Sequence, residues 1–313
     1  MPGGTLSTKL HLLMPTYNRA RMLERTISTL YLQDADPALW HLTVVDNAST
    51  DGTRDYLDTC AARWSNFDYV INERNLGLFG NLNRCMDLSR TQKFMIIHSD
   101  DDVDASLVSS VLDFIDLHPT VQMCFGTCRA LLDDTGEIIP RWYDSKIVGE
   151  RDRILLSNEF LGALMRSASN FIFAPTVVYD RTFFSSELRY SQDYEFASDL
   201  DLWFRAALRD PIVGCMSVPR ITCRIHSERL SHGHAKAMRL EAVAIIRKHL
   251  GAIRRHGPKA VINTRLALFI SAKLQLFEFA IRSGLVPAFK ARRMVMSALE
   301  SLVPKANNRG IIR

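Results

Sequence analysis

The stretch Lys93-Phe-Met-Ile-Ile-His-Ser-Asp-Asp-Asp-Val-Asp104 joins an apolar run directly to three consecutive acidic residues. The run Phe94–Ile97 is short and rich in β-branched and aromatic side chains, which favours a buried strand over a helix. Three adjacent carboxylates repel one another unless a cation lies among them. Mg²⁺ and Mn²⁺ prefer carboxylate oxygen and often share their coordination shell with phosphates. The stretch therefore indicates a metal site for a phosphorylated substrate or, alternatively, an acidic cap on the next helix.

Three similar apolar runs precede this stretch, at residues 10–14, 42–45 and 67–71. Helix-like segments separate the four runs, at about 21–32, 50–63 and 78–88. Strands that alternate with helices through short connections predict right-handed βαβ units and a mainly parallel sheet covered on both faces. In such sheets the ligand binds beyond the carboxyl ends of the strands.

Each of the four predicted strands is followed by polar residues. The four loops are Pro15–Arg19, Asp46–Ser49, Asn72–Gly77 and Asp100–Asp102. We expect them to converge on one edge of the sheet and to form a binding site there. The alternative is that loops after strands are commonly polar without binding anything.

The second half of the chain is less regular. We expect a helix at 106–118, strands at 121–126, 171–178 and 212–218, and a helix at 199–208. Pro175 suggests that the strand at 171–178 lies at an edge or that a strand begins there. From residue 236 onward the pattern predicts helices at about 236–256, 258–283 and 287–302. We therefore predict an α/β catalytic domain over 1–235, with halves 1–104 and 105–235, and a helical extension over 236–313.

The bulk composition is that of a soluble globular protein, with 47% apolar and 23% charged residues among 313. The N-terminus has no signal-peptide pattern, and no run of about 18 apolar residues indicates a membrane span. The six cysteines are scattered without zinc-ligand spacing, which favours buried thiols in a reducing cytoplasm.

The charge is unevenly divided along the chain. Residues 236–313 hold 16 Lys and Arg against 3 Asp and Glu, a balance of +13. Residues 1–235 hold the remaining 23 and 31, a balance of −8. Three roles fit the basic helices: packing on the catalytic domain, a homo-oligomer interface, or peripheral contact with an anionic inner membrane face.

An ordered set of motifs over residues 10–235 resembles the inverting glycosyltransferase family 2, which has the Rossmann-like glycosyltransferase type A fold. The motifs are Met14-Pro-Thr-Tyr-Asn-Arg19, Val45-Asp-Asn-Ala-Ser-Thr-Asp-Gly-Thr53, Asn75-Leu-Gly77, Asn81, Ser99-Asp-Asp-Asp102, Asp199-Leu-Asp-Leu-Trp-Phe-Arg205 and Arg224-Ile-His-Ser-Glu-Arg-Leu-Ser231. The basic tail lies outside the resemblance.

The resemblance implies that the first loops hold a nucleoside-diphosphate sugar, with UDP or dTDP favoured. The expected donor-binding residues are Pro15, Thr16, Tyr17, Asn18, Asp46, Asn75, Gly77, Asp100 and Asp101. Asp46 could accept from the imino N–H of uracil or thymine, or could instead close an Asx turn or cap the next helix. Gly77 could allow close backbone approach or serve only as a helix entry.

The family's metal motif is an Asp-X-Asp pattern, and its register in this chain is ambiguous. Asp100 and Asp102 satisfy it directly, whereas alignment on the following helix selects Ser99 and Asp101. We expect Asp102 or Asp101 to bind Mn²⁺ or Mg²⁺, with Asp100 nearer the ribose. The resemblance also places His226 at the metal or the pyrophosphate.

Inverting transfer needs a general base for the acceptor hydroxyl. The family draws this base from a Glu-Asp or similar pair at a helix start, and Ser198-Asp199 stands there in this chain. We expect Asp199 to be the catalytic base. The missing neighbouring acid removes one cause of a raised pKa.

The sequence thus predicts a cytoplasmic, metal-dependent inverting glycosyltransferase acting on a saccharide or lipid-linked acceptor, with surface polysaccharide synthesis as the setting that the resemblance suggests. No nucleic-acid partner is expected. A sugar-phosphate nucleotidyltransferase is the enzyme alternative, although residues 14–22 lack its Gly-rich triphosphate loop and lysine. A nucleotide-sugar-binding protein without catalysis is the other alternative.

Overall fold

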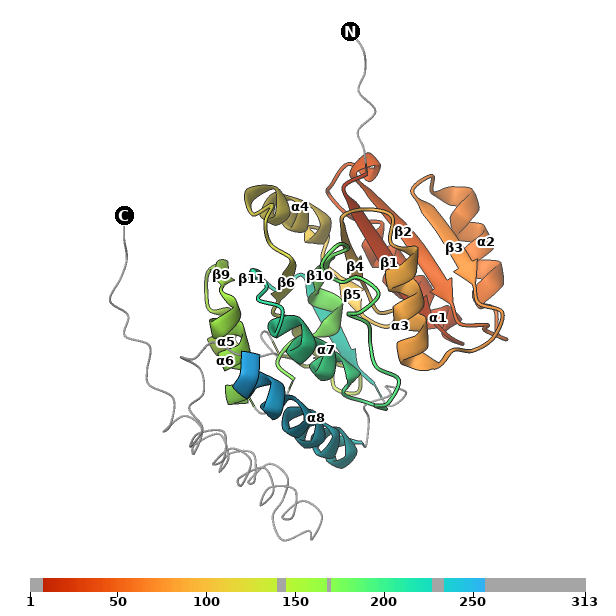
Figure 1. The fold of residues 1–313 in the computed structure, drawn as a ribbon. Coiled ribbons are helices and arrows are strands. Elements are labelled where there is room, and N and C mark those ends of the chain that lie inside the picture. Colours follow the sequence, from red (N-terminus) through yellow and green to blue (C-terminus); the bar gives the residue numbers. More distant parts are fainter. Residues whose placement is uncertain (1–7, 140–144, 168–169, 227–233, 257–313) are drawn as a thin grey trace.

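The computed structural model describes residues 8–139, 145–167, 170–226 and 234–256 as a large β-sheet between helices, with a small second sheet beside it (Figure 1). The large sheet has eight strands. In spatial order they are β3 (Phe67–Ile71), β2 (Trp40–Asp46), β1 (Leu10–Thr16), β4 (Lys93–Ile96), β10 (Val178–Asp180), β6 (Met123–Gly126), β11 (Val213–Met216) and β9 (Arg153–Leu155).

The four strands predicted in the first hundred residues are confirmed, and they pair in parallel. Leu12 of β1 is in register with Leu42 of β2 on one side and with Met95 of β4 on the other. The carboxyl ends of these strands therefore meet at one edge of the sheet, as the sequence predicted. The fold is the expected α/β architecture with a mainly parallel first half.

Helices cover both faces of the sheet because strand side chains alternate between them. Leu12 of β1 belongs to one hydrophobic core, and its neighbour Leu13 belongs to the other. The Leu12 side is covered by α1 (Ala20–Leu30), α2 (Thr53–Arg63) and α4 (Leu107–Leu117). The Leu13 side is covered by α3 (Gly77–Leu88), α6 (Ser157–Ser167), α7 (Ser198–Ala207) and α8 (Ala235–His256). Three short segments complete the helices: η1 (Pro37–Leu39), α5 (Ser145–Val148) and η2 (Ala174–Thr176).

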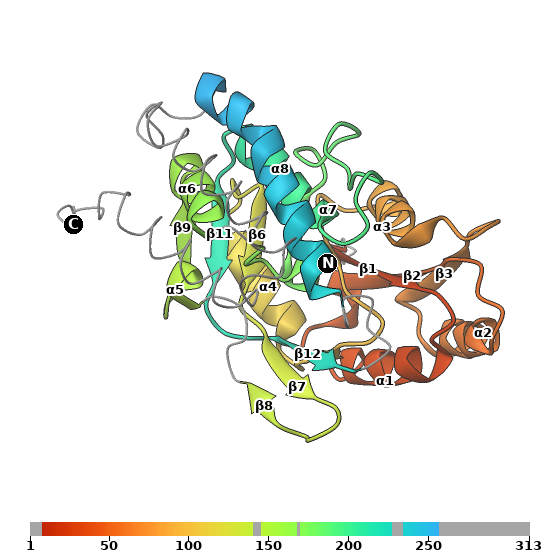
Figure 2. The same cartoon turned by 90° about the horizontal axis from the view of Figure 1, so that it is seen from below.

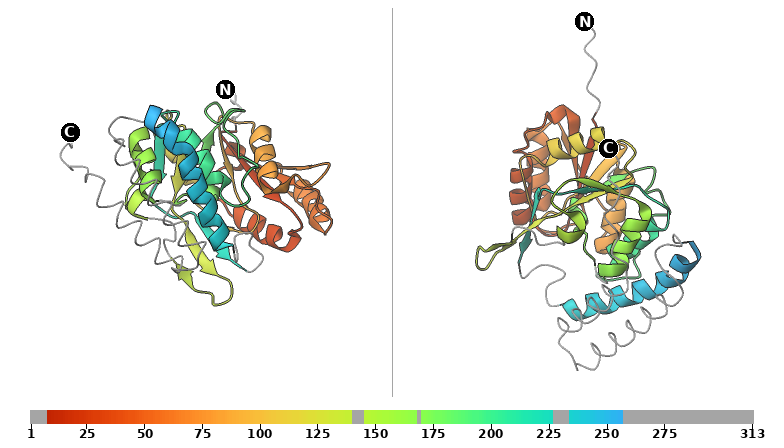
Figure 3. Two further views of the ribbon diagram at one scale, coloured as in Figure 1. Left: turned by 60° about the horizontal axis from the view of Figure 1, so that its bottom comes forward. Right: turned by 90° about the vertical axis from the view of Figure 1, so that its left-hand side faces the viewer.

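A second, smaller sheet lies beside the first. Its strands are β5 (Asp102–Val103), β12 (Ile221–Ile225), β7 (Arg129–Leu132) and β8 (Ile138–Ile139), in that order. The β7–β8 hairpin projects from the body of the molecule (Figure 2, and Figure 3, left). Antiparallel pairing sets Thr222 of β12 opposite Asp102 of β5. This pairing carries the polar residues after 222 to the acidic stretch.

The strand prediction for 171–178 was wrong over most of its length. Residues 174–176 form η2, and the strand β10 begins only at Val178. β10 is not an edge strand, because it pairs antiparallel with both β4 and β6. Pro175 instead occupies the first turn of η2, where its missing N–H costs no hydrogen bond.

The C-terminal prediction is confirmed as far as the structure describes the chain. The helix expected at 236–256 is α8, and its apolar side chains join the same core as α7. The helices expected at 258–283 and 287–302 lie outside the described residues. Among the helices that are described, none is both long and apolar enough to cross a membrane.

Candidate active site

The loops after β1 and β2 are locked together by backbone and side-chain hydrogen bonds. The Asn18 N–H donates to the Ser49 hydroxyl at 2.8 Å, and the Thr50 N–H donates to the Asn18 side-chain oxygen at 2.8 Å. Asn18 has φ 50°, in the left-handed region that asparagine tolerates better than most residues. The Asn47 N–H also donates to the Thr16 carbonyl at 2.9 Å. The predicted donor residues Thr16 and Asn18 thus form one structural unit with the next loop.

A network of asparagine side chains continues this edge toward α3. Asn47 donates to the Asn75 oxygen at 2.8 Å and accepts from Asn72 at 3.0 Å. Asn72 also donates to Asn81 at 2.9 Å, and Asn81 donates to the Val45 carbonyl at 3.0 Å. Sequence reasoning placed Asn75 at the site but assigned no role to Asn47 or Asn72. The recurrence of Asn in three successive strand-end segments was the available signal.

Asp46 is buried, with 1% of its surface exposed. Its carboxylate accepts from the Ser49 N–H at 3.2 Å and from the Ser49 hydroxyl. This is the Asx-type turn that the sequence offered as the alternative to base recognition.

Two side chains at the same edge are exposed apolar groups. Tyr17, in the loop after β1, is 42% exposed, and Leu78, in the first turn of α3, is 42% exposed. Pro15 is buried opposite Val45, beyond the point where the pairing of β1 with β4 ends. Gly77 has φ +73° and opens α3, so its conformation, rather than a lack of space, favours glycine.

The three consecutive aspartates point to different partners. Asp102 lies between two guanidinium groups, with Arg25 at 3.2 Å and Arg224 at 2.9 Å. Asp100 pairs with Arg19 and lies 3.3 Å from His226 Nε2. The pairing of β12 with β5 brings in Arg224 and His226, and α1 with its N-cap supplies the other two arginines.

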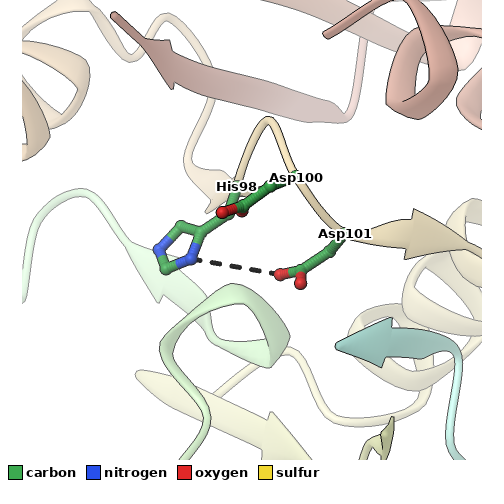
Figure 4. Close-up of side chains that lie close together, drawn as sticks. All are labelled: His98, Asp100 and Asp101. Carbon is green, nitrogen blue, oxygen red and sulfur yellow. Dashed lines mark ion pairs between the residues drawn. The ribbon is translucent and has the colours of Figure 1, made fainter. Parts of the chain in front are cut away.

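Asp101 belongs to the same turn and is almost fully buried. Its carboxylate accepts from the Arg224 backbone N–H at 3.3 Å and lies 4.0 Å from His98 Nδ1. His98, Asp100 and Asp101 each offer a ligand atom, and these atoms lie within 4.8 Å of one another (Figure 4). Imidazole nitrogen and carboxylate oxygen suit Mn²⁺ well and Mg²⁺ less well.

The structure therefore brings all the predicted metal-site residues together, but these residues have different partners. Asp101 is in the group with metal-ligand spacing, and His226 borders that group through Asp100. Asp102 faces the two arginines instead. Sequence reasoning missed His98, although it stands two residues before Asp100 in the quoted stretch.

Asp199 lies in the first turn of α7, as predicted. Its carboxylate accepts from the Leu200 N–H at 2.7 Å and from the Asn170 side-chain amide. Burial, together with a smaller effect from the charge of Glu241, raises the pKa of Asp199 to about 7 against the lowering effect of these hydrogen bonds. Neither Asn170 nor Glu241 was identified from the sequence. The Ser198 hydroxyl, where the family has an acid, donates to the Ser191 carbonyl at 2.7 Å.

Residues 170–173 connect the two groups of acids. Asn170 contacts Asp199, and the Phe173 ring lies edge-on to the His98 ring at a centroid distance of 6.2 Å. A carboxyl that can take up a proton near neutrality therefore lies one short segment away from a charge-rich site with metal-ligand spacing.

The sequence model of the family described as glycosyl transferase family 2 matches residues 12–173. The chain belongs to this family. The match covers the loops after β1 to β4 and ends at Phe173, so α7 and α8 of this family 2 protein lie beyond it.

Curated relatives match the protein over limited lengths. The uncharacterized protein MT1568 of Mycobacterium tuberculosis is 26% identical over 223 residues, which are 68% of this chain and 66% of the relative. Abequosyltransferase RfbV of Salmonella typhimurium is 28% identical over 116 residues, 36% of this chain and 34% of that protein. Validoxylamine A glucosyltransferase of Streptomyces hygroscopicus is 45% identical over 74 residues, 23% and 16% respectively. The matches span less than two thirds of each relative.

Solved structures share the fold at low identity. TarS (residues 1–349) of S. aureus in complex with UDP-GlcNAc superposes with a TM-score of 0.64 and 15% identity, covering 94% of this chain and 92% of that chain. The mannosyltransferase PcManGT of Pyrobaculum calidifontis, in complex with GDP-Man and Mn²⁺, gives 0.57 and 17%, covering 95% and 76%. At these identities the likeness concerns the fold, which agrees with the glycosyltransferase type A architecture.

Proposed function

We propose that this protein is an inverting, metal-dependent glycosyltransferase that transfers the sugar of a UDP-sugar or dTDP-sugar to a saccharide or lipid-linked acceptor. The observation that carries the proposal is that residues 170–173 contact two acidic regions of different character, the turn after β4 and the start of α7. One group is rich in compensating cations, and the other is a carboxyl whose pKa is raised to about 7. Single-displacement transfer needs both a site for a leaving diphosphate and a base for the acceptor.

The donor would bind along the edge formed by the loops after β1, β2 and β3. Exposed Tyr17 offers a face on which a base can stack, and the asparagine network fixes the loops on which it lies. Family membership supports a nucleotide-sugar donor, and the complexes of TarS and PcManGT contain such donors. In this chain Asp46 would act by holding the loop after β2 in shape.

The divalent cation would be held by Asp101 and Asp100, with His98 as the third ligand. These donors fit the ion in chemical type and in spacing. When bound, the ion supplies Lewis-acid stabilisation of the negative charge that develops on the departing diphosphate. Arg19 pairs with Asp100 and Arg25 pairs with the adjacent Asp102, and both guanidinium groups can also contact phosphate oxygens there.

Asp199 would accept the proton of the acceptor hydroxyl as that hydroxyl attacks the anomeric carbon. A base works best when its pKa lies near the operating pH, and a value of about 7 meets this condition. The Asn170 amide would orient the carboxylate toward the acceptor.

A thermal-shift screen with nucleoside diphosphates and Mn²⁺ tests the donor and metal parts of the proposal. We expect UDP or dTDP to raise the melting temperature, by an amount equivalent to about 2.7 kcal/mol at a concentration near 100 Kd. EDTA should remove the shift. A shift that persists in EDTA would contradict metal dependence, and the absence of a shift with every nucleoside diphosphate would contradict the donor class.

NMR of the sugar released from UDP-glucose tests the stereochemistry. The released sugar should be the β anomer, because the donor is α-linked and the reaction inverts.

The two alternatives make different predictions. A nucleotidyltransferase would release pyrophosphate from UTP or dTTP and a sugar phosphate, and family membership argues against it. A binding protein without catalysis would show the thermal shift but no donor hydrolysis. The raised pKa of Asp199 favours catalysis, because a partly buried carboxyl whose described donors are neutral groups is costly to keep for binding alone.

A further inference from the structure

The backbone that leads into α7 is held by a side chain from the C-terminal helix. Three consecutive N–H groups donate to the Glu241 carboxylate: Glu195 at 2.8 Å, Phe196 at 2.9 Å and Ala197 at 2.8 Å. Glu241 belongs to α8, which runs beside α7 (Figures 1 and 2). The segment it holds ends two residues before Asp199.

Glu241 accepts from the N–H of Ala197, the N-cap residue of α7, and from the two N–H groups before it, so it holds the backbone that enters the helix. Ala197 is the N-cap of α7 and has no side chain that could accept from the first-turn N–H groups. A carboxylate near a helix N-terminus is stabilised by the exposed N–H groups and by the helix dipole. Hydrogen bonds to a charged acceptor are also roughly twice as strong as neutral ones. Glu241 therefore fixes backbone that would otherwise depend on the turn alone.

The position of Glu241 is itself fixed by a second contact between the two helices. Two turns further along α8, His249 Nε2 lies 2.9 Å from the buried Asp201 carboxylate and Lys248 Nζ lies 3.2 Å from it. The His249 ring also stacks on Phe204 with centroids 5.4 Å apart. Apolar side chains of α8 between these contacts, including Val243 and Ile246, are buried in the same core. The two helices are thus joined at both ends of their contact.

We infer that Glu241 is a positioning residue for the catalytic base, so that α8 is part of the active-site structure. The inference rests on the proposed role of Asp199. Glu241 holds residues 195–197, and these set where α7 begins and where the Asp199 carboxylate lies. It also brings to Asp199, through the fold, the neighbouring acid that the sequence lacks at Ser198.

The ionisable groups around Asp199 allow the effect to be read from a pH profile. Tyr179 of β10 and Tyr190 of the preceding loop share a hydrogen bond of 2.7 Å, and burial raises the pKa of both phenols. Both therefore stay neutral near pH 7, and their burial leaves Glu241 as the charged side chain that raises the pKa of Asp199. Removing its charge should lower the pKa of Asp199 and shift the acid limb of turnover to lower pH.

The test compares Glu241→Gln and Glu241→Ala in the full chain, with Ala244→Gln as the control on the exposed side of α8. Turnover is measured as UDP release from UDP-glucose with Mn²⁺. We expect kcat to fall about tenfold in Glu241→Gln and about 100-fold in Glu241→Ala, because small misplacements of a catalytic group are costly. KM should change less than about twofold, because the donor edge is untouched, and a loss of fold alone would not produce this split. The acid limb of Glu241→Gln should move to lower pH, and Ala244→Gln should behave as wild type.

Hydrogen exchange of residues 195–200 gives a second measurement that needs no turnover. We expect faster exchange in both Glu241 variants and no change in Ala244→Gln, because alanine removes the acceptor of the N–H groups and glutamine replaces the carboxylate with a weaker, neutral acceptor. Unchanged exchange together with wild-type kcat and pH profile would overturn the inference. Faster exchange in a protein whose wild type hydrolyses no donor would instead overturn the proposed function and leave the structural role of Glu241 intact.

Discussion

The turn after β4 and the start of α7 are both acidic, but their carboxylates have different partners. Asp102 lies between two arginines, and Asp100 pairs with a third. Among the described residues, Asp199 accepts from the neutral Leu200 N–H and Asn170 amide, and the charge of the acidic Glu241 contributes to raising its pKa. The first region pairs its carboxylates with guanidinium groups, whereas burial in the second raises the pKa of a carboxyl to about 7. Two environments thus give one residue type two kinds of chemistry.

The same contrast recurs within α7. Asp201 is fully buried, yet hydrogen bonds from His249 and Arg205 outweigh its burial and hold its pKa well below the usual range. Asp199, two residues earlier, has no such cationic partner in the part of the chain that the structure describes, and its pKa is raised. The number of cationic partners, more than the depth of burial, therefore separates a structural acid from a candidate base.

The largest expected effect comes from Asp199→Asn. Removing the base should lower turnover of UDP-glucose by about 10²–10⁴-fold, the usual contribution of general base catalysis. UDP binding in the thermal-shift assay should stay unchanged, because the donor edge is separate. Asp193→Asn, an exposed acid of the same loop, is the matched control and should retain wild-type turnover.

A pH profile of the wild type checks the same assignment without a substitution. The base must be ionised, so turnover should fall about tenfold per pH unit below pH 7 and level off above it. A profile that stays flat from pH 5 to 8 would contradict Asp199 as the base.

The next effect separates the three consecutive aspartates. Asp101→Asn should abolish the Mn²⁺-dependent part of UDP binding, weakening it by about 100-fold, since an amide is a poorer ligand for a hard cation. Asp102→Asn should weaken it less, because Asp102 faces two arginines, and should lower the melting temperature instead. The reverse order of the two variants in a Mn²⁺ titration would show that the register chosen from the geometry is wrong.

The smallest effect on activity should come from Asp201→Asn. Breaking a buried ion pair should lower the free energy of unfolding by about 3 kcal/mol while folded protein keeps its turnover. Because its folded pKa is depressed, Asp201 stabilises the protein above the unfolded pKa of about 4, and this stability is lost as pH falls further. Urea denaturation should therefore show that the free energy of unfolding falls less between pH 7 and pH below 4 in the variant than in the wild type. Equal stability at pH 7 would mean that Asp201 does not hold α8.

Local patterns predicted the first half of the molecule well. β1 to β4 have continuous apolar runs, and the parallel arrangement then follows from chain connection rules, so the loops at the carboxyl edge were predictable together. β5 has two residues, too few for any periodic signal, and its partner β12 lies more than a hundred residues away. The pairing that brings Arg224 to Asp102 therefore could not be foreseen.

The candidate site was also predictable only where its residues lie in local sequence motifs. Asp199 and the acidic stretch carry motifs, whereas Asn170 and Glu241 act across the fold from segments without one. His98 lay inside the decisive stretch but looked like the polar end of a strand, because an isolated histidine carries little information about ligation.

The asparagine network at the donor edge has a consequence for how the protein responds to its surroundings. Asn47, Asn72, Asn75 and Asn81 are joined by amide hydrogen bonds that carry no net charge. Such bonds neither titrate nor weaken through ionic screening. The framework for the nucleotide should therefore keep one shape over a wide range of acidity and ionic strength.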